Sequence, residues 1–314
     1  MKKLFLPLLI LMAGCTAAPT EPVIPEPDMT LTLYPQGQAA DLGIVEDGVA
    51  VTLGPGADNG LGSAMEIGEL MHYSKVGDEA FMSIWLPEKC NGRMLIICPG
   101  GGYRYCSGEN EGVCFAKWCV EHGIAACMLI YRMPQGNPYI PLTDVQNAFR
   151  YCRYHAAEWG VETIGTIGFS AGGHLVSTAS TKYVDSITRP DFSIMVYGFL
   201  DLSTWEFSGS ATRCNQHLTA NDPALMEEFT AYKHVTSDTP PALLLLSTDD
   251  PLVSPVNSIG YYDALVENGV PAEMHILRDG GHGWGFRTAP IGEDKLTPGT
   301  RALVSDIIEN WLGI

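Results

Sequence analysis

The chain has little positive charge and no long hydrophobic run. Its 314 residues contain 18 lysines and arginines against 36 aspartates and glutamates, which gives a formal net charge of −18. Nucleic acids and anionic membranes attract basic surfaces, so this balance argues against both as partners. The apolar run from Leu4 to Ala13 is too short to span a bilayer as a helix.

The sequence also lacks the patterns that are typical of metal sites and of glycosidase active sites. The nine cysteines form no C-x-x-C pair, and none stands at zinc-ligand spacing from a histidine. No pair of carboxylates is placed as a glycosidase would need. We therefore expect no metal and no cofactor. Cys98, Cys127 and Cys152 lie in apolar patterns, which favours buried free thiols over the disulfides that an exported protein is able to form.

The amino terminus has the pattern of an export signal. Two lysines precede the short apolar run, and the segment from Leu11 to Cys15 resembles a bacterial lipobox. Residues 1–14 are interpreted as a signal peptide, and Cys15 as the lipidated residue of a tether over 15–28. The alternative is an ordinary cleaved signal with a chance cysteine. The expected location is the bacterial envelope or cell surface, with membrane contact only through the lipid.

Residues 29–314 show strands and helices in alternation, the pattern of a single α/β domain. Such alternation predicts a mostly parallel sheet with helices on both faces. Residues 198–239 have weak periodicity and are interpreted as a cap or lid over the site. Strands are expected at 79–86, 93–98, 124–131, 163–169, 192–197, 242–247 and 272–277, and helices at 111–122, 142–158, 257–268 and 301–311.

A G-x-S-x-G motif stands between one predicted strand and the helix that follows it. The motif is Gly168-Phe169-Ser170-Ala171-Gly172. A serine at the apex of such a turn has a strained backbone and an exposed hydroxyl, and the flanking glycines avoid collisions. The alternative is a serine that merely caps the helix. The motif alone does not decide between the two.

Candidate partners for this serine follow later strands. His282 lies in a glycine-rich loop after the strand that ends near Leu277, where it can act as a base. Asp249 and Asp250 follow another buried strand. Asp250 is preferred as the acid that orients the histidine because it stands three residues before Val253, and Asp249 is then a turn residue. The chain order serine, aspartate, histidine is that of an α/β-hydrolase.

Three glycines in Pro99–Tyr103 follow the central strand and predict an oxyanion loop. The expected donors are the N–H groups of Ala171 and of Gly101 or Gly102. Other candidates have plainer interpretations. His174 is expected to be a packed histidine rather than a second base. Trp205, Trp284 and Phe286 form either an aromatic wall for a sugar or part of the core. Glu109 and Glu111 are expected to be acids at the start of a helix.

Together these motifs resemble the secreted bacterial carbohydrate esterases of the α/β-hydrolase fold, of the acetylxylan-esterase type. The matching segments lie at 98–103, 131–134, 168–175, 249–253, 257–258 and 280–283. The resemblance implies a serine esterase that removes acetyl or other short acyl groups from plant polysaccharides such as xylan, with an acylated oligo- or polysaccharide as substrate. The alternatives are a serine exopeptidase of the same fold and a non-catalytic sugar-binding lipoprotein.

Overall fold

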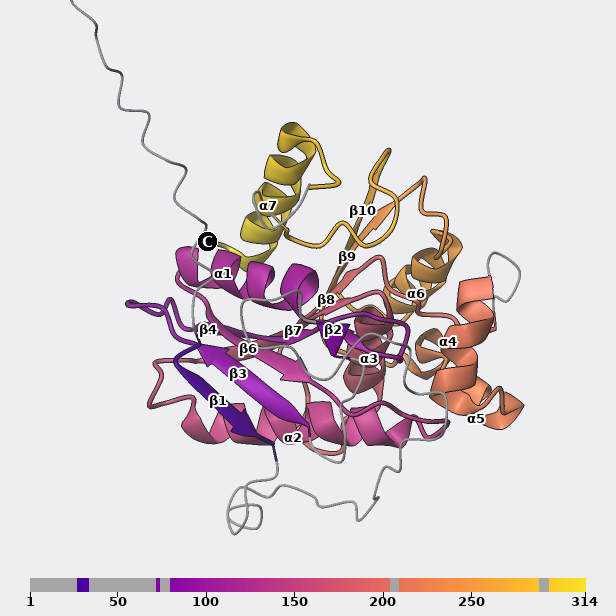
Figure 1. The fold of residues 1–314 in the computed structure, drawn as a ribbon. Coiled ribbons are helices and arrows are strands. Elements are labelled where there is room, and N and C mark those ends of the chain that lie inside the picture. Colours follow the sequence, from indigo (N-terminus) through magenta and orange to yellow (C-terminus); the bar gives the residue numbers. More distant parts are fainter. Residues whose placement is uncertain (1–26, 34–71, 74–79, 204–208, 288–293) are drawn as a thin grey trace, which may run out of the picture.

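The computed structural model describes residues 27–33, 72–73, 80–203, 209–287 and 294–314. The signal peptide, Cys15, most of the tether and Trp205 lie outside these ranges. Within them, strands and helices alternate along the chain (Figure 1). The strands are β1 (Met29–Thr32), β2 (His72–Tyr73), β3 (Phe81–Trp85), β4 (Arg93–Cys98), β5 (Cys106–Ser107), β6 (Ala125–Ile130), β7 (Thr163–Phe169), β8 (Ser193–Val196), β9 (Ala242–Ser247) and β10 (Ala272–Leu277).

The helices follow most of the parallel strands. The long ones are α1 (Cys114–Glu121), α2 (Tyr139–His155), α3 (Ala171–Thr181), α4 (Gly209–Thr219), α6 (Val256–Glu267) and α7 (Pro298–Leu312). Shorter helical segments are the π-helical turn η1 (Glu109–Val113), α5 (Pro223–Glu228) and the 3₁₀ turn η2 (Ala231–His234). None of the helices in the described ranges is both long and apolar enough to cross a bilayer.

Eight of the described strands form one sheet in the order β1-β3-β6-β4-β7-β8-β9-β10. In this spatial order, all strands from β6 onward, β4 included, run parallel to one another. Strand β3 pairs antiparallel with both β6 and β1. Helices α1 and α7 cover one face, and α2, α3 and α6 cover the other (Figure 1). This arrangement confirms the predicted mostly parallel α/β fold.

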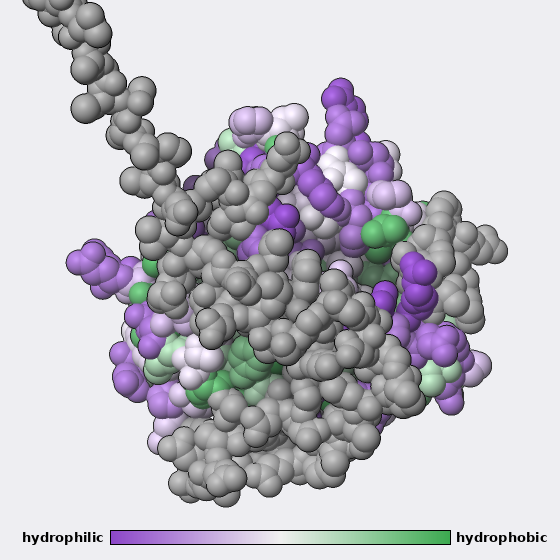
Figure 2. Space-filling model, in the orientation of Figure 1, coloured by the Kyte–Doolittle hydropathy of each residue, from purple (hydrophilic) through white to green (hydrophobic). Residues whose placement is uncertain are grey.

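The central strands are buried on both faces, which explains their continuous apolar sequences. All six residues of β6 and of β9 are buried, and so is β4 after Arg93. The predicted bounds of β4, β9 and β10 match the structure. The coloured surface in Figure 2 is mostly hydrophilic, and its hydrophobic side chains lie in small separate groups. The buried apolar side chains form a core cluster that joins the strands of the sheet with helices on both of its faces.

Two helices begin earlier than the sequence predicts. Helix α2 starts at Tyr139 and α7 at Pro298, each three residues before the expected start. Pro141 lies in the first turn of α2, where a missing N–H leaves no hydrogen bond unmade. The predicted cap region holds α4, α5 and η2 among its described residues, and its function as a lid stays a prediction.

The parallel register brings several strand ends to one edge of the sheet. Strands β4, β7, β8, β9 and β10 are neighbours, and their carboxyl ends are Cys98, Phe169, Val196, Ser247 and Leu277. Ligands of open α/β sheets bind outside these ends. The five loops that follow these strands are therefore the ones that build the site.

Candidate active site

Ser170 occupies the sharp turn between β7 and α3. Its backbone has φ 51° and ψ −117°, a strained conformation for a residue with a side chain. The flanking glycines are needed for close packing. A Cβ on Gly168 would lie 2.1 Å from the carbonyl oxygen of Gly172, and one on Gly172 would lie 2.0 Å from the carbonyl oxygen of Cys98. The turn therefore has the geometry that the motif predicts.

The structure brings Ser170, His282 and Asp250 together. The Nε2 of His282 lies 2.8 Å from the hydroxyl of Ser170, and its Nδ1 lies 2.7 Å from Oδ2 of Asp250. The second oxygen of Asp250 accepts the N–H groups of Leu252 and Val253 at 2.8 and 2.9 Å. These bonds orient the carboxylate toward the imidazole, and the imidazole toward the serine.

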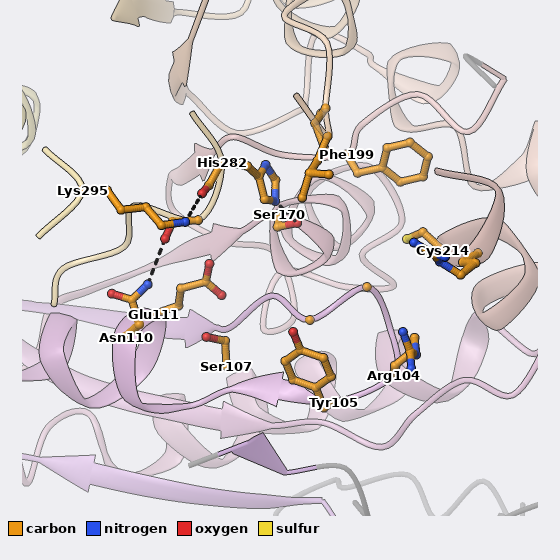
Figure 3. Close-up of a pocket in the computed structure, with 16 residues that line it drawn as sticks. Arg104, Tyr105, Ser107, Asn110, Glu111, Ser170, Phe199, Cys214, His282 and Lys295 are labelled. Carbon is orange, nitrogen blue, oxygen red and sulfur yellow. Dashed lines mark hydrogen bonds between the residues drawn. The ribbon is translucent and has the colours of Figure 1, made fainter. Parts of the chain in front are cut away.

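The side chains that hold the histidine loop come from three other segments. Asp249, the alternative acid, accepts the N–H of Gly281 at 2.8 Å, so it shapes this loop without touching the imidazole. Lys295 donates to the carbonyl oxygen of His282 at 2.6 Å, and Asn110 donates to that of Gly283 at 3.1 Å (Figure 3). The imidazole is thus fixed by its own backbone as well as by Asp250.

The glycine loop after β4 packs directly against the serine turn. A Cβ on Gly100 would lie 2.7 Å from the carbonyl oxygen of Phe169, and one on Gly101 would lie 2.1 Å from that of Tyr105. Gly101 and Gly102 line the same pocket as Ser170, and their φ values are +132° and +64°. Ala171 is the first residue of α3. The predicted oxyanion donors therefore belong to the two segments that meet at the serine, and their role stays a prediction.

The pocket around Ser170 has a volume of about 320 Å³. Lys295 and Asn110 lie on one side of the serine and histidine, and Arg104 and Cys214 lie on the other (Figure 3). Cys214 comes from α4, so the predicted cap region contributes to the pocket wall. In the described ranges, no three His, Cys, Asp or Glu side chains gather as metal ligands do.

Three of the other candidates, His174, Trp284 and Phe286, do not line the pocket around Ser170. His174 is buried, and its ring bonds the hydroxyl of Tyr103 at 2.7 Å and the carbonyl oxygen of Phe229 at 2.8 Å, as a packed histidine does. Trp284 and Phe286 are buried in the core. The structure therefore supports a core position, and not a sugar-binding wall, for Trp284 and Phe286.

Comparison with known proteins shows the family of the chain. Residues 82–265 match the BD-FAE family. The chain belongs to the BD-FAE family.

Named relatives of this BD-FAE chain are hydrolases. It is 37% identical over 217 residues to an acetylxylan esterase of Xylanibacter ruminicola, covering 67% of this chain and 45% of that protein. It is 27% identical over 207 residues to endo-1,4-beta-xylanase B of Butyrivibrio fibrisolvens, covering 60% and 32%. The chain thus spans less than half the length of both relatives.

A solved structure extends this likeness to the fold. It is the acetyl ester-xyloside bifunctional hydrolase from Caldicellulosiruptor lactoaceticus, which matches with a TM-score of 0.60 and 31% identity. The match covers 74% of this chain and 88% of that one. These comparisons support a carbohydrate or ester hydrolase with the α/β-hydrolase fold.

Two further residues, Glu111 and Tyr197, belong to the site, although the sequence did not predict this. Glu111 was expected to be an acid at a helix start, and it does lie in the first turn of η1. Its carboxylate, however, lines the pocket and accepts hydrogen bonds from Gly100 and Tyr197. The ring of Tyr197, just after β8, lies 4.9 Å from that of His282. No local sequence pattern distinguishes these two residues from ordinary core or helix-start residues.

Proposed function

We propose that this protein is a serine carboxylesterase that removes acetyl or other short acyl groups from plant polysaccharides such as xylan. The observation that carries the proposal is the hydrogen-bonded series Asp250–His282–Ser170 at the wall of an open pocket. The likeness to an acetylxylan esterase supports the choice of substrate. The substrate partner is then an acylated oligo- or polysaccharide.

The proposed reaction passes through an acyl-enzyme. The oxygen of Ser170 attacks the ester carbonyl while its proton moves to Nε2 of His282. The N–H groups of Ala171 and of Gly101 or Gly102 bind the resulting oxyanion. The C–O bond to the sugar then breaks, and the leaving sugar oxygen takes the proton from His282. Water, deprotonated by the same imidazole, next attacks the acyl-enzyme and releases the carboxylic acid.

The direct test is hydrolysis of p-nitrophenyl acetate and acetylated xylan by Ser170→Ala. We expect kcat to fall by at least about 10⁴-fold, because the nucleophile is gone while folding is unaffected. A fluorophosphonate probe is expected to label the wild-type protein and not the variant. Undiminished hydrolysis by Ser170→Ala would rule out the proposed mechanism. Acetylated xylan, feruloylated oligosaccharides and simple esters, compared side by side, test the acyl group and the sugar.

We further propose that Cys15 carries lipid and anchors the domain at the bacterial surface. The support is the lipobox-like segment that ends at Cys15, which lies outside the described residues. Mass spectrometry of the mature protein tests this proposal. An unmodified Cys15, or cleavage at another position, would contradict it.

A further inference from the structure

One buried carboxylate outside the Ser170–His282–Asp250 triad connects the glycine loop after β4 with the loop that carries His282. Glu111 is only 4% exposed, and it lies between Asn110 and Ser107 in the pocket wall (Figure 3). Its Oε2 accepts the N–H of Gly100 at 2.8 Å. Gly100 is the first of the three glycines of the proposed oxyanion loop, and a Cβ on it would lie 2.9 Å from the Cβ of Ser170, so this bond holds the start of that loop beside the serine.

The other oxygen of Glu111 reaches the histidine loop through Tyr197. The hydroxyl of Tyr197 donates to Oε1 of Glu111 at 2.9 Å and accepts the N–H of Gly285 at 3.0 Å. Gly285 lies three residues after His282, and the Tyr197 ring packs against the imidazole with 4.9 Å between ring centres. Tyr197 also has φ 39°, so its backbone is held in a strained conformation.

The direction of these hydrogen bonds shows what the network requires at Glu111. Gly285 donates to Tyr197, Tyr197 donates to Glu111, and Gly100 donates to the same carboxyl group from the other side. Both oxygens of Glu111 therefore act as acceptors. An ionised carboxylate meets this requirement, whereas an amide offers one acceptor oxygen and places donor hydrogens on the other side.

Burial makes this carboxylate costly, which argues that it has a role beyond packing. The pKa of Glu111 is raised above its ordinary value, because desolvation outweighs the hydrogen bonds from Tyr197 and Gly100 and the nearby charges of His282 and Lys295, which lower it. Removing the carboxylate would leave the N–H of Gly100 and the hydroxyl of Tyr197 without their acceptor, so both loops depend on this side chain.

We propose that Glu111 is a positioning residue that fixes the oxyanion loop relative to the histidine loop, through Gly100 on one side and Tyr197 on the other. This inference rests on the proposed esterase function. Glu111 itself transfers no proton and touches no reacting atom. It is expected to influence the transition state, where the oxyanion donors and the imidazole must be aligned at once, more than substrate binding.

The experiment compares Glu111→Gln, Tyr197→Phe and the double variant with a matched control. The control is Glu109→Gln, which removes a second buried acid from the same turn, one that pairs with Arg287 at 3.3 Å and does not line the pocket. For each variant, kcat and KM for p-nitrophenyl acetate are measured, with the active enzyme counted by fluorophosphonate labelling. Melting temperatures are recorded in parallel.

We expect Glu111→Gln and Tyr197→Phe each to lower kcat by about 10- to 100-fold, somewhat less than the loss of an oxyanion donor itself. KM is expected to change by less than about 3-fold, because ground-state binding is not the step affected. The double variant is expected to be little worse than the poorer single variant, because both break one network. Glu109→Gln is expected to keep kcat within about 2-fold of wild type.

Two results overturn the inference in different ways. If Glu111→Gln and Tyr197→Phe keep the kcat of the control, whatever their melting temperatures, Glu111 has only a structural role. Loss of hydrolysis in Ser170→Ala would in that case leave the proposed esterase function standing. Full hydrolysis by Ser170→Ala would instead remove that function and this inference with it. Should Glu111→Gln fail to fold, Tyr197→Phe, which keeps the ring, still decides the question.

Discussion

Acid conditions are expected to destabilise the fold through one buried histidine. His174 lies in α3 and is 1% exposed. The carbonyl oxygen of Phe229 only accepts hydrogen bonds, so Nε2 of His174 carries the hydrogen, and Nδ1 accepts from the hydroxyl of Tyr103. A neutral ring satisfies both partners. A charged ring would be desolvated and would direct a second N–H at a hydroxyl that already donates.

The size of the effect follows from the pKa. Burial lowers the pKa of His174 to about 4, from an ordinary value of 6.5. Below pH 6.5 the unfolded chain binds a proton that the folded protein does not bind, so stability is full above that pH and falls as pH decreases toward 4. At 1.36 kcal/mol per pH unit, the loss between pH 7.5 and pH 5 is about 2 kcal/mol from this group.

Urea unfolding of the wild type and of His174→Gln, measured under reducing conditions at pH 7.5, 6.5, 5.5 and 5.0, tests this expectation. Glutamine keeps one acceptor and one donor but does not titrate. Carboxylates contribute to the pH dependence of both proteins, so the difference between them isolates His174. The free energy of unfolding of the wild type should fall about 2 kcal/mol further than that of the variant by pH 5. Parallel pH profiles would refute the reasoning.

Three further predictions concern the acid loop, the serine turn and helix α6. Asp250→Asn is expected to lower kcat for p-nitrophenyl acetate by about 10³- to 10⁴-fold, whereas Asp249→Asn, which weakens one loop hydrogen bond, should cost about 10-fold or less. Equal losses would contradict the assignment. In denaturant unfolding, Gly172→Ala is expected to cost about 3 kcal/mol, because its Cβ would lie 2.0 Å from a carbonyl oxygen. Gly260→Ala, in helix α6 with nothing within 4 Å of the new Cβ, should gain about 0.5–1 kcal/mol; a loss there would contradict that account.

The fold and the triad contacts were accessible from the sequence because their signals are local. A strand buried on both faces needs apolar residues throughout, so β4 and β9 were predicted with their observed bounds. The serine turn needs glycines at fixed positions, and chain order placed the acid and the base. The starts of α2 and α7 were predicted too late because each first turn contains a proline, and from sequence alone a proline is easily taken for the end of a loop rather than part of a helix.

The remaining part of the site depends on contacts between distant segments. Glu111 and Tyr197 are 86 positions apart, and their hydrogen bond exists only because the β4 and β8 loops meet at one sheet edge. Before folding, Glu111 has the same local pattern as any acid at a helix start. The adjacent acids Asp249 and Asp250 could be ranked by spacing, but only the structure shows that both act on the histidine loop.

The free thiols have a consequence for the reactivity of the folded domain. The eight cysteines from Cys90 to Cys214 form no crosslink in the part of the chain that the structure describes. The pKa is raised in five of them, which keeps these thiols in the unreactive protonated form. The main cause is burial in Cys98, Cys106, Cys119 and Cys214, and in Cys127 it is a hydrogen bond with Cys152, followed by burial. A protonated thiol is a poor nucleophile, so these five side chains are expected to resist alkylation and disulfide exchange for as long as the domain stays folded.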